Sequence, residues 1–122
     1  MAGKLTTHVL DTARGCPGKG ITIELWRINS DSILEEKTLL KTTTTNHDGR
    51  TDEPLLANED FKTGVYELVF RVGDYFANWE ENLPSPAFLD YIPLRFGIAD
   101  INAHYHVPLL VSPWSYSTYR GS

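Results

Sequence analysis

The stretch that decides the fold is the C-terminal segment, which reads His104-Tyr105-His106-Val107-Pro108-Leu109-Leu110-Val111-Ser112-Pro113-Trp114-Ser115-Tyr116-Ser117-Thr118-Tyr119-Arg120-Gly121-Ser122. Successive side chains of a β-strand point to opposite faces of a sheet, so His104 and His106 are expected on one face of such a strand. Chain ends are usually polar and frayed, whereas this one is aromatic and rich in hydroxyl groups. We therefore expect a terminal strand that reaches a functional surface.

An alternation with a period of two continues through most of the chain. The expected strands cover residues 5–11, 21–26, 37–45, a short segment near Arg50, 65–72, 92–98, 103–111 and 114–119. Pro93 cannot donate a ladder hydrogen bond, so its strand is expected at a sheet edge. The alternation breaks at residues 74–81, where we predict a short helix with Asp74 as its N-cap. Residues 54–63 are expected to form a loop. Eight short strands with one small helix predict an all-β, two-sheet sandwich.

Composition and charge narrow the class of protein. A chain of 122 residues is expected to form a single domain, residues 1–122. Its net charge of -5 offers no basic patch for a nucleic acid, and no apolar run is long enough to cross a membrane. The lone cysteine, Cys16, excludes an intrachain disulfide, and an apolar signal segment is absent at the N-terminus. We therefore expect a cytoplasmic protein, with the peroxisome as the open alternative, and no nucleic-acid or membrane partner.

Three histidines and an arginine suggest where chemistry could take place. His8 lies in the first expected strand, and if this strand pairs with the one that holds His104 and His106, the imidazoles meet on one sheet face. Positive charge from Arg50 would lower the pKa of a nearby imidazole and favour its free base, which suits general acid–base catalysis. Two alternatives stay open at this point. One is a zinc site, which the repelling arginine disfavours, and the other is an exposed face that histidines merely decorate.

Five segments carry a more specific pattern. They are Leu5-Thr6-Thr7-His8-Val9-Leu10-Asp11, Gly15-Cys16-Pro17-Gly18, Asn46-His47-Asp48-Gly49-Arg50, the segment His104–Leu110, and Tyr119-Arg120-Gly121-Ser122. In this order and spacing they resemble the transthyretin-related 5-hydroxyisourate hydrolases, over nearly the whole chain. The resemblance implies an eight-stranded sandwich of transthyretin type with its helix after the fifth strand. It also implies a homotetramer, a dimer of dimers whose active sites lie at the dimer–dimer contact.

The resemblance further implies an activity and a set of site residues. Members of this family hydrolyse 5-hydroxyisourate, the product of urate oxidation, to 2-oxo-4-hydroxy-4-carboxy-5-ureidoimidazoline through attack of water on a ring carbonyl. The catalytic residues carried over are His8, Arg50, His106 and Ser122, and the substrate-binding residues are His8, Arg50, Tyr119 and Ser122. Either His106 or His8 takes the proton from water, Arg50 stabilises the oxyanion, and His104 orients its neighbour. No metal or other cofactor is implied.

Two rival functions belong to other classes. One is a carrier that uses the channel of the same fold to bind a small molecule resembling thyroid hormone; the family's carrier lacks the histidines and the Tyr-Arg-Gly-Ser end present here. The other is a sandwich module of an adhesion protein or receptor, which is usually secreted and often disulfide-bonded. The sequence favours the hydrolase, with a small purine-derived substrate as its partner.

Overall fold

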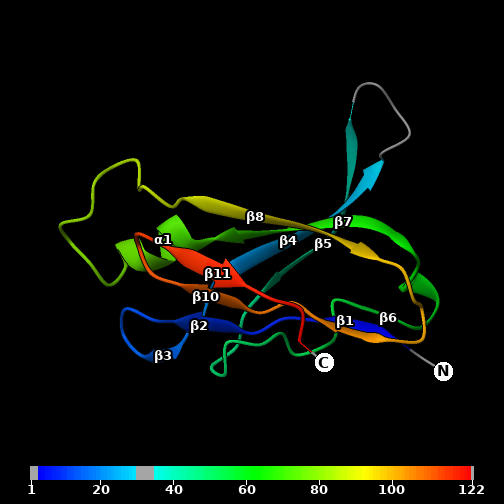
Figure 1. Ribbon diagram of the computed structural model, residues 1–122. Helices are drawn as coiled ribbons and strands as arrows, with labels where there is room; N and C mark the ends of the chain where they lie inside the picture. Colours follow the sequence, from blue (N-terminus) through cyan, green and yellow to red (C-terminus); the bar gives the residue numbers. More distant parts are fainter. Residues whose placement is uncertain (1–2, 30–34, 122) are drawn as a thin grey trace.

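The computed structural model describes residues 3–29 and 35–121, and it consists of two layers of β-strands with one short α-helix (Figure 1). In chain order the elements are β1 (Lys4–Thr6), β2 (Val9–Asp11), β3 (Cys16–Pro17), β4 (Thr22–Asn29), β5 (Glu36–Thr44), β6 (Leu56–Ala57), a 3-10 helix (Asn58–Asp60), β7 (Gly64–Arg71), α1 (Val72–Ala77), β8 (Tyr91–Ile98), β9 (His104–His106), β10 (Leu109–Val111) and β11 (Tyr116–Thr118). The predicted all-β sandwich with one short helix is confirmed.

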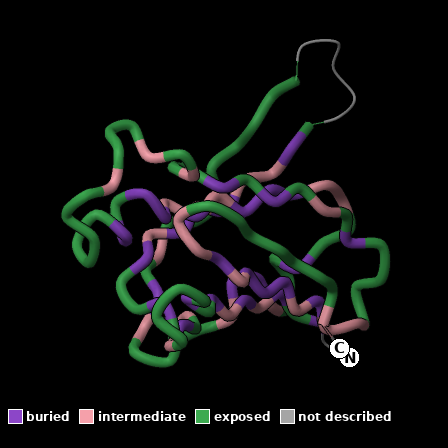
Figure 2. The backbone as a smooth tube through the Cα atoms, turned by 60° about the vertical axis from the view of Figure 1, so that its left-hand side comes forward, coloured by how far each residue is buried: buried purple, intermediate pink, exposed green. Residues whose placement is uncertain are grey.

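One layer is the antiparallel sheet β5-β4-β7-β8. Its alternation places apolar side chains toward the other layer, and Leu25 of β4 together with Leu68 and Phe70 of β7 are fully buried there. Figure 2 shows such buried residues along the strands of both layers, with exposed residues mainly in the loops. β8 pairs only with β7, so the strand that contains Pro93 lies at a sheet edge, as predicted.

The second layer carries the candidate site and consists of two hydrogen-bonded sets, β6-β1-β9 and β11-β10-β2-β3. β1 runs parallel to β9, and β2 runs parallel to β10. The chain passes from one set to the other at residues 7–8 and again at 107–108, where Pro108 lacks an N–H for the ladder. Two backbone hydrogen bonds bridge this interruption, from Val107 to the Thr6 carbonyl and from Leu109 to the His8 carbonyl, both at 2.9 Å.

The described residues contain eleven strands, whereas the sequence predicts eight. The predicted strand 5–11 divides into β1 and β2 because it is interrupted at residues 7–8. The predicted strand 103–111 divides into β9 and β10 because it is interrupted at residues 107–108. β3 adds a short strand in the turn after β2. The strand predicted near Arg50 is reduced to a single bridge with His8. Instead, β6 and a 3-10 helix form in residues 54–63, which the sequence analysis assigns to a loop.

Helix α1 begins earlier than predicted. It starts at Val72, directly after β7, with Arg71 at the N-cap and no side-chain capping bond. Asp74 therefore lies inside the first turn, where its carboxylate still interacts favourably with the positive end of the helix dipole. Burial of Val72 and Phe76, one turn apart, explains the early start because both pack into the core. Within residues 3–29 and 35–121, no helix is long and apolar enough to cross a membrane.

Candidate active site

The two histidines of β9 lie on the outer face of their sheet. Lys4 pairs in register with His104, and Thr6 pairs with His106. The intervening Tyr105 is buried between the layers, while both imidazoles are only half-buried. The two imidazole ring centres are 6.1 Å apart. The predicted sharing of one face by His104 and His106 is thus a consequence of strand alternation.

Thr6 links these two imidazoles. Its hydroxyl oxygen lies 2.7 Å from Nε2 of His104 and 2.8 Å from Nδ1 of His106. A hydroxyl group has one proton to donate and two lone pairs that accept. Thr6 can therefore form both hydrogen bonds at once, and the protonation of one ring is tied to that of the other.

A tight turn positions Arg50. The side-chain oxygen of Asn46 accepts hydrogen bonds from the backbone N–H groups of Asp48 and Arg50, at 2.9 and 3.2 Å. Gly49 has a φ of 78°, which favours glycine, and a Cβ at this position would lie 2.4 Å from the Val9 carbonyl oxygen. The turn can therefore close against β2 only with glycine at this point.

His8 lies beside this turn. It forms an antiparallel bridge with Arg50, and its Nε2 lies 2.9 Å from the backbone oxygen of Asp48. Because a carbonyl oxygen only accepts, Nε2 of His8 must carry the proton of this hydrogen bond. In neutral His8, the atom left to accept a proton is therefore Nδ1.

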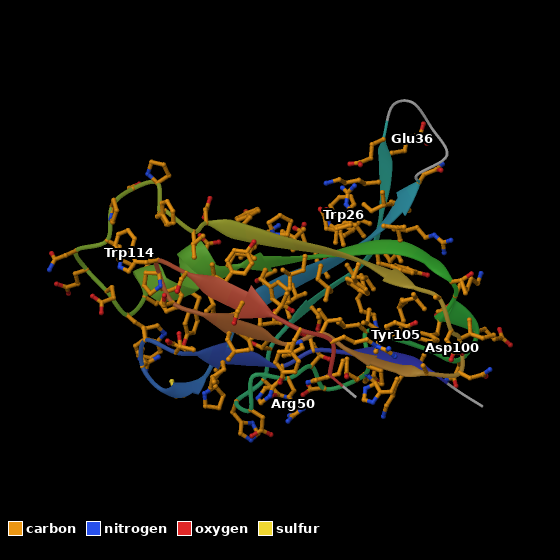
Figure 3. The ribbon with its side chains drawn as sticks, in the orientation of Figure 1. Trp26, Glu36, Arg50, Asp100, Tyr105 and Trp114 are labelled. Atoms are coloured by element: carbon orange, nitrogen blue, oxygen red, sulfur yellow. The ribbon has the colours of Figure 1, made fainter. Side chains whose placement is uncertain are left out.

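A polar cavity of about 360 Å³ brings Arg50 and the two β9 histidines together, and His8 is not among the residues that line it. Its lining includes Lys4, Thr6, Arg50, Asp52, His104 and His106. Figure 3 shows Arg50 beneath the layer that contains β1 and β2, on the side away from β8. No ion pair with a carboxylate of the described residues occupies the Arg50 guanidinium. The cavity therefore combines an available cation with two adjacent imidazoles.

The environment lowers the pKa of both imidazoles on β9. For His106 the cause is first burial and then the charges of Arg50, His104 and His8. For His104 it is burial followed by the charge of Lys4. Since the ordinary value is 6.5, both rings are mainly neutral at pH 7 and can accept a proton.

The metal alternative finds no support in this geometry. Among the side chains in the described part of the chain, no group of three or more His, Cys, Asp and Glu residues is arranged to hold a metal ion. Thr6 also engages one nitrogen of each β9 histidine. The two imidazoles are therefore arranged as hydrogen-bond partners of one hydroxyl group.

The structure does not bring Tyr119 into this cavity within the single chain. Tyr119 is 60% exposed and lines a mainly apolar groove of about 430 Å³ between β8 and the C-terminal segment, together with Phe96 and Tyr105. Ser122 lies outside the described residues. The preceding Gly121 donates its backbone N–H to the carbonyl of His106 at 2.7 Å, so the C-terminal segment does come back to the histidine strand.

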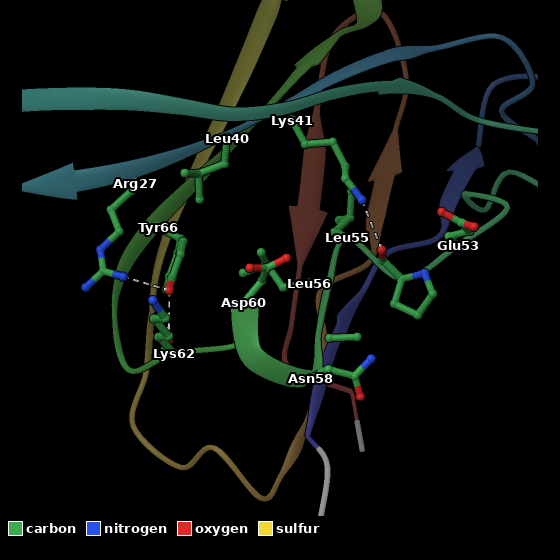
Figure 4. Close-up of a pocket in the computed structure, with 12 residues that line it drawn as sticks. Arg27, Leu40, Lys41, Glu53, Leu55, Leu56, Asn58, Asp60, Lys62 and Tyr66 are labelled. Carbon is green, nitrogen blue, oxygen red and sulfur yellow. Dashed lines mark hydrogen bonds between the residues drawn. The ribbon is translucent and has the colours of Figure 1, made fainter.

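A larger cavity of about 610 Å³ lies apart from the histidines, beside β5 (Figure 4). Two of its cations contact neutral oxygens: Arg27 donates to the Tyr66 hydroxyl at 3.1 Å, and Nζ of Lys41 lies 3.5 Å from the Pro54 carbonyl. No histidine lines it. Because it lacks a base that titrates near neutral pH, the smaller cavity is the better candidate for acid–base chemistry.

Sequence reasoning missed two residues of the site, Thr6 and Lys4. Alternation does place Thr6 on the same face as His8. The register that sets Thr6 opposite His106 joins residues 100 positions apart, and no local signal reveals it. The role of the Asp48 carbonyl in fixing the His8 ring is equally hidden, because backbone groups leave no mark in a sequence.

Known proteins resemble this chain along its whole length. The HIUase/Transthyretin family matches residues 5–121. A 5-hydroxyisourate hydrolase of Pseudomonas aeruginosa is 61% identical over 120 residues, which cover 98% of this chain and 92% of that protein. A 5-hydroxyisourate hydrolase of Mus musculus is 42% identical over 118 residues, covering 97% of this chain and 94% of that protein.

Solved structures agree with this similarity. The 5-hydroxyisourate hydrolase of Klebsiella pneumoniae superimposes with a TM-score of 0.78 at 32% identity, covering 98% of this chain and 100% of that one. Sea bream transthyretin in complex with thyroxine gives a TM-score of 0.84 at 25% identity, covering 97% of this chain and 94% of that one. An (S)-allantoin synthase gives 0.90 at 48% identity over 99% of this chain, which spans only 44% of that longer chain.

Proposed function

This chain belongs to the HIUase/Transthyretin family, and on that premise we propose that it hydrolyses 5-hydroxyisourate to 2-oxo-4-hydroxy-4-carboxy-5-ureidoimidazoline. The observation that carries the proposal is the cavity in which neutral His104 and His106 lie beside Arg50, whose guanidinium forms no ion pair within residues 3–29 and 35–121. Relatives named 5-hydroxyisourate hydrolase, up to 61% identical, support it.

Each group has a role that follows from its position. His106 lines the cavity and has a lowered pKa, so it takes the proton from the attacking water. A positioned base of this kind contributes about 10²–10⁴-fold to the rate. Arg50 binds the carbonyl oxygen of the substrate and stabilises the negative charge that develops on it. His8, fixed through the Asp48 carbonyl, offers Nδ1 as a second hydrogen-bonding atom for the heterocycle.

The carrier alternative has one supporting observation, the similarity to a transthyretin solved with thyroxine. The candidate cavity of this chain, however, is lined by titratable and charged side chains. A carrier has no need of a neutral imidazole beside a guanidinium. We therefore favour the hydrolase.

We also propose that the working form is a homotetramer, a dimer of dimers, in the cytoplasm. The single chain leaves the edge strands β8 and β11 uncovered, with Trp114, Tyr116 and Tyr119 between 43% and 60% exposed. Such edges and aromatic patches favour association. Contacts between subunits would allow Tyr119 and Ser122 to complete a site that one chain leaves open.

A spectrophotometric assay of freshly prepared 5-hydroxyisourate tests the function. The protein is expected to accelerate its decay, and His8→Ala, Arg50→Ala and His106→Ala are each expected to lose most of the activity, at least about 10²-fold for the base. Far-UV circular dichroism of each variant controls for folding. Decay at the same rate with and without the protein would refute the hydrolase, and full rate in all three variants would refute the site.

A further inference from the structure

We propose that Thr6 is a positioning residue whose hydroxyl group holds His106 in the tautomer with a free Nε2, and that it transmits this choice from His104. The inference rests on the proposed function in one respect, namely that His106 acts as the base. The hydrogen bonds between His104 and Thr6 and between Thr6 and His106 are present in the protein without substrate.

One side chain, that of Thr6, forms a hydrogen bond with both rings. Its hydroxyl oxygen lies within 2.8 Å of a nitrogen of each histidine, and the parallel register sets it directly opposite His106. As a β-branched residue on a strand, threonine has a restricted χ1 angle, so the hydroxyl is held at this point. The side chain is half-buried, which limits competition from solvent.

When the Thr6 hydroxyl donates its proton to one of the two rings, two arrangements are self-consistent. In the first, His106 Nδ1–H donates to the Thr6 oxygen, and the Thr6 hydroxyl donates to unprotonated Nε2 of His104. In the second, His104 Nε2–H donates to the Thr6 oxygen, and the hydroxyl donates to unprotonated Nδ1 of His106. Each arrangement uses one proton per hydrogen bond and requires the ring that accepts from Thr6 to be neutral, in agreement with the lowered pKa values of both rings.

Only the first arrangement produces a base. It leaves Nε2 of His106 unprotonated and places the proton of His104 on Nδ1. When Nε2 then takes a proton from water, the imidazolium that forms still donates Nδ1–H to Thr6, and the hydroxide is released toward the substrate carbonyl. The second arrangement occupies Nε2 with a proton and cannot accept one there. Thr6 and His104 together therefore decide whether His106 is competent.

Two substitutions separate this role from packing. Thr6→Val keeps the branched shape and removes the hydroxyl, and we expect kcat to fall by about 10–100-fold with KM little changed, as for other partners that orient a functional imidazole. Thr6→Ser keeps the hydroxyl and is expected to retain kcat within about threefold. Thr12→Val is the matched control, because Thr12 donates instead to the Val111 carbonyl outside the cavity, and it is expected to leave kcat unchanged.

Nitrogen-15 NMR of the histidine rings in the unliganded protein provides a readout that packing alone would not move. In the wild type, His106 is expected to carry its proton on Nδ1, and Thr6→Val is expected to shift it toward Nε2. A proton on Nε2 of His106 in the wild type, the same tautomer in both proteins, or full kcat in Thr6→Val would overturn the proposal. If the wild type fails to hydrolyse 5-hydroxyisourate, the proposed function fails, while the NMR result still decides the role of Thr6.

Discussion

At the scale of single residues, the site depends on neutral imidazoles kept close to a permanent cation. Burial and the charge of Arg50 both lower the pKa of His106, so the same guanidinium that would stabilise an oxyanion also keeps the base unprotonated. Fixed backbone and hydroxyl partners hold the rings in place, as the Asp48 carbonyl does for His8. On the proposed assignment, Arg50 therefore has two tasks.

The pH dependence of the reaction tests this double role. The base must be neutral, so kcat/KM is expected to fall with decreasing pH, along a limb centred below the ordinary histidine value of 6.5. Arg50→Gln removes one cause of the lowered pKa, so the pKa of His106 rises and the limb moves to higher pH, in addition to a lower plateau. Arg50→Lys keeps the charge and should keep the limb in place. An unchanged limb, or one that moves to lower pH, in Arg50→Gln would contradict the assignment of His106 as the base.

At the scale of elements, the sequence predicts faces better than it predicts registers. Alternation correctly predicts that His104 and His106 share a face, and the missing N–H of Pro93 correctly predicts that its strand is an edge. Which residue of β1 faces His106 depends on pairing across 100 positions. The start of α1 likewise follows burial of Val72 rather than the capping signal of Asp74. Long-range packing supplies the information that these local patterns lack.

The turn that carries Arg50 yields a prediction at this scale. Gly49→Ala combines an unfavourable φ with a Cβ 2.4 Å from the Val9 carbonyl oxygen, so it is expected to lower both the stability and the activity. Gly20→Ala has a similar φ of 79° but meets nothing within 4 Å, and is expected to cost only about 1–2 kcal/mol, with activity retained. Urea unfolding measures the stability of both variants, and the decay assay measures their activity. Equal losses of stability and activity in both variants would show that the close approach of Gly49 to β2 is unimportant.

At the scale of the whole molecule, the two-layer sandwich follows from the period of two, and its division into eleven strands does not. The interruptions at residues 7–8 and 107–108 lie opposite one another in the same layer, next to His8 and His106. The site thus lies where the ladder of this layer changes from one hydrogen-bonded set to the other. Tyr119 stays outside the cavity of the single chain, which is a reason to expect a contribution from a second subunit.

Association can be tested on the exposed edge. The Tyr116 side chain on β11 is 43% exposed, and Tyr116→Arg places a charge at this edge. The substitution is expected to disrupt the proposed tetramer and, with it, to reduce the activity. Ile101→Arg, at a 51% exposed position in the turn before β9 and outside every strand, is the matched control and should remain tetrameric and active. Size-exclusion chromatography with light scattering, coupled to the decay assay, reads both properties. A dissociated Tyr116→Arg protein with full activity would refute the shared site.

The most direct test of the central claim is a crystal structure with a non-hydrolysable purine analogue, which shows where a substrate-like heterocycle binds. We expect the analogue in the 360 Å³ cavity, with a carbonyl oxygen against the Arg50 guanidinium and Nε2 of His106 facing the carbon that water attacks. An analogue bound instead in the larger cavity beside β5, away from both β9 histidines, would contradict it.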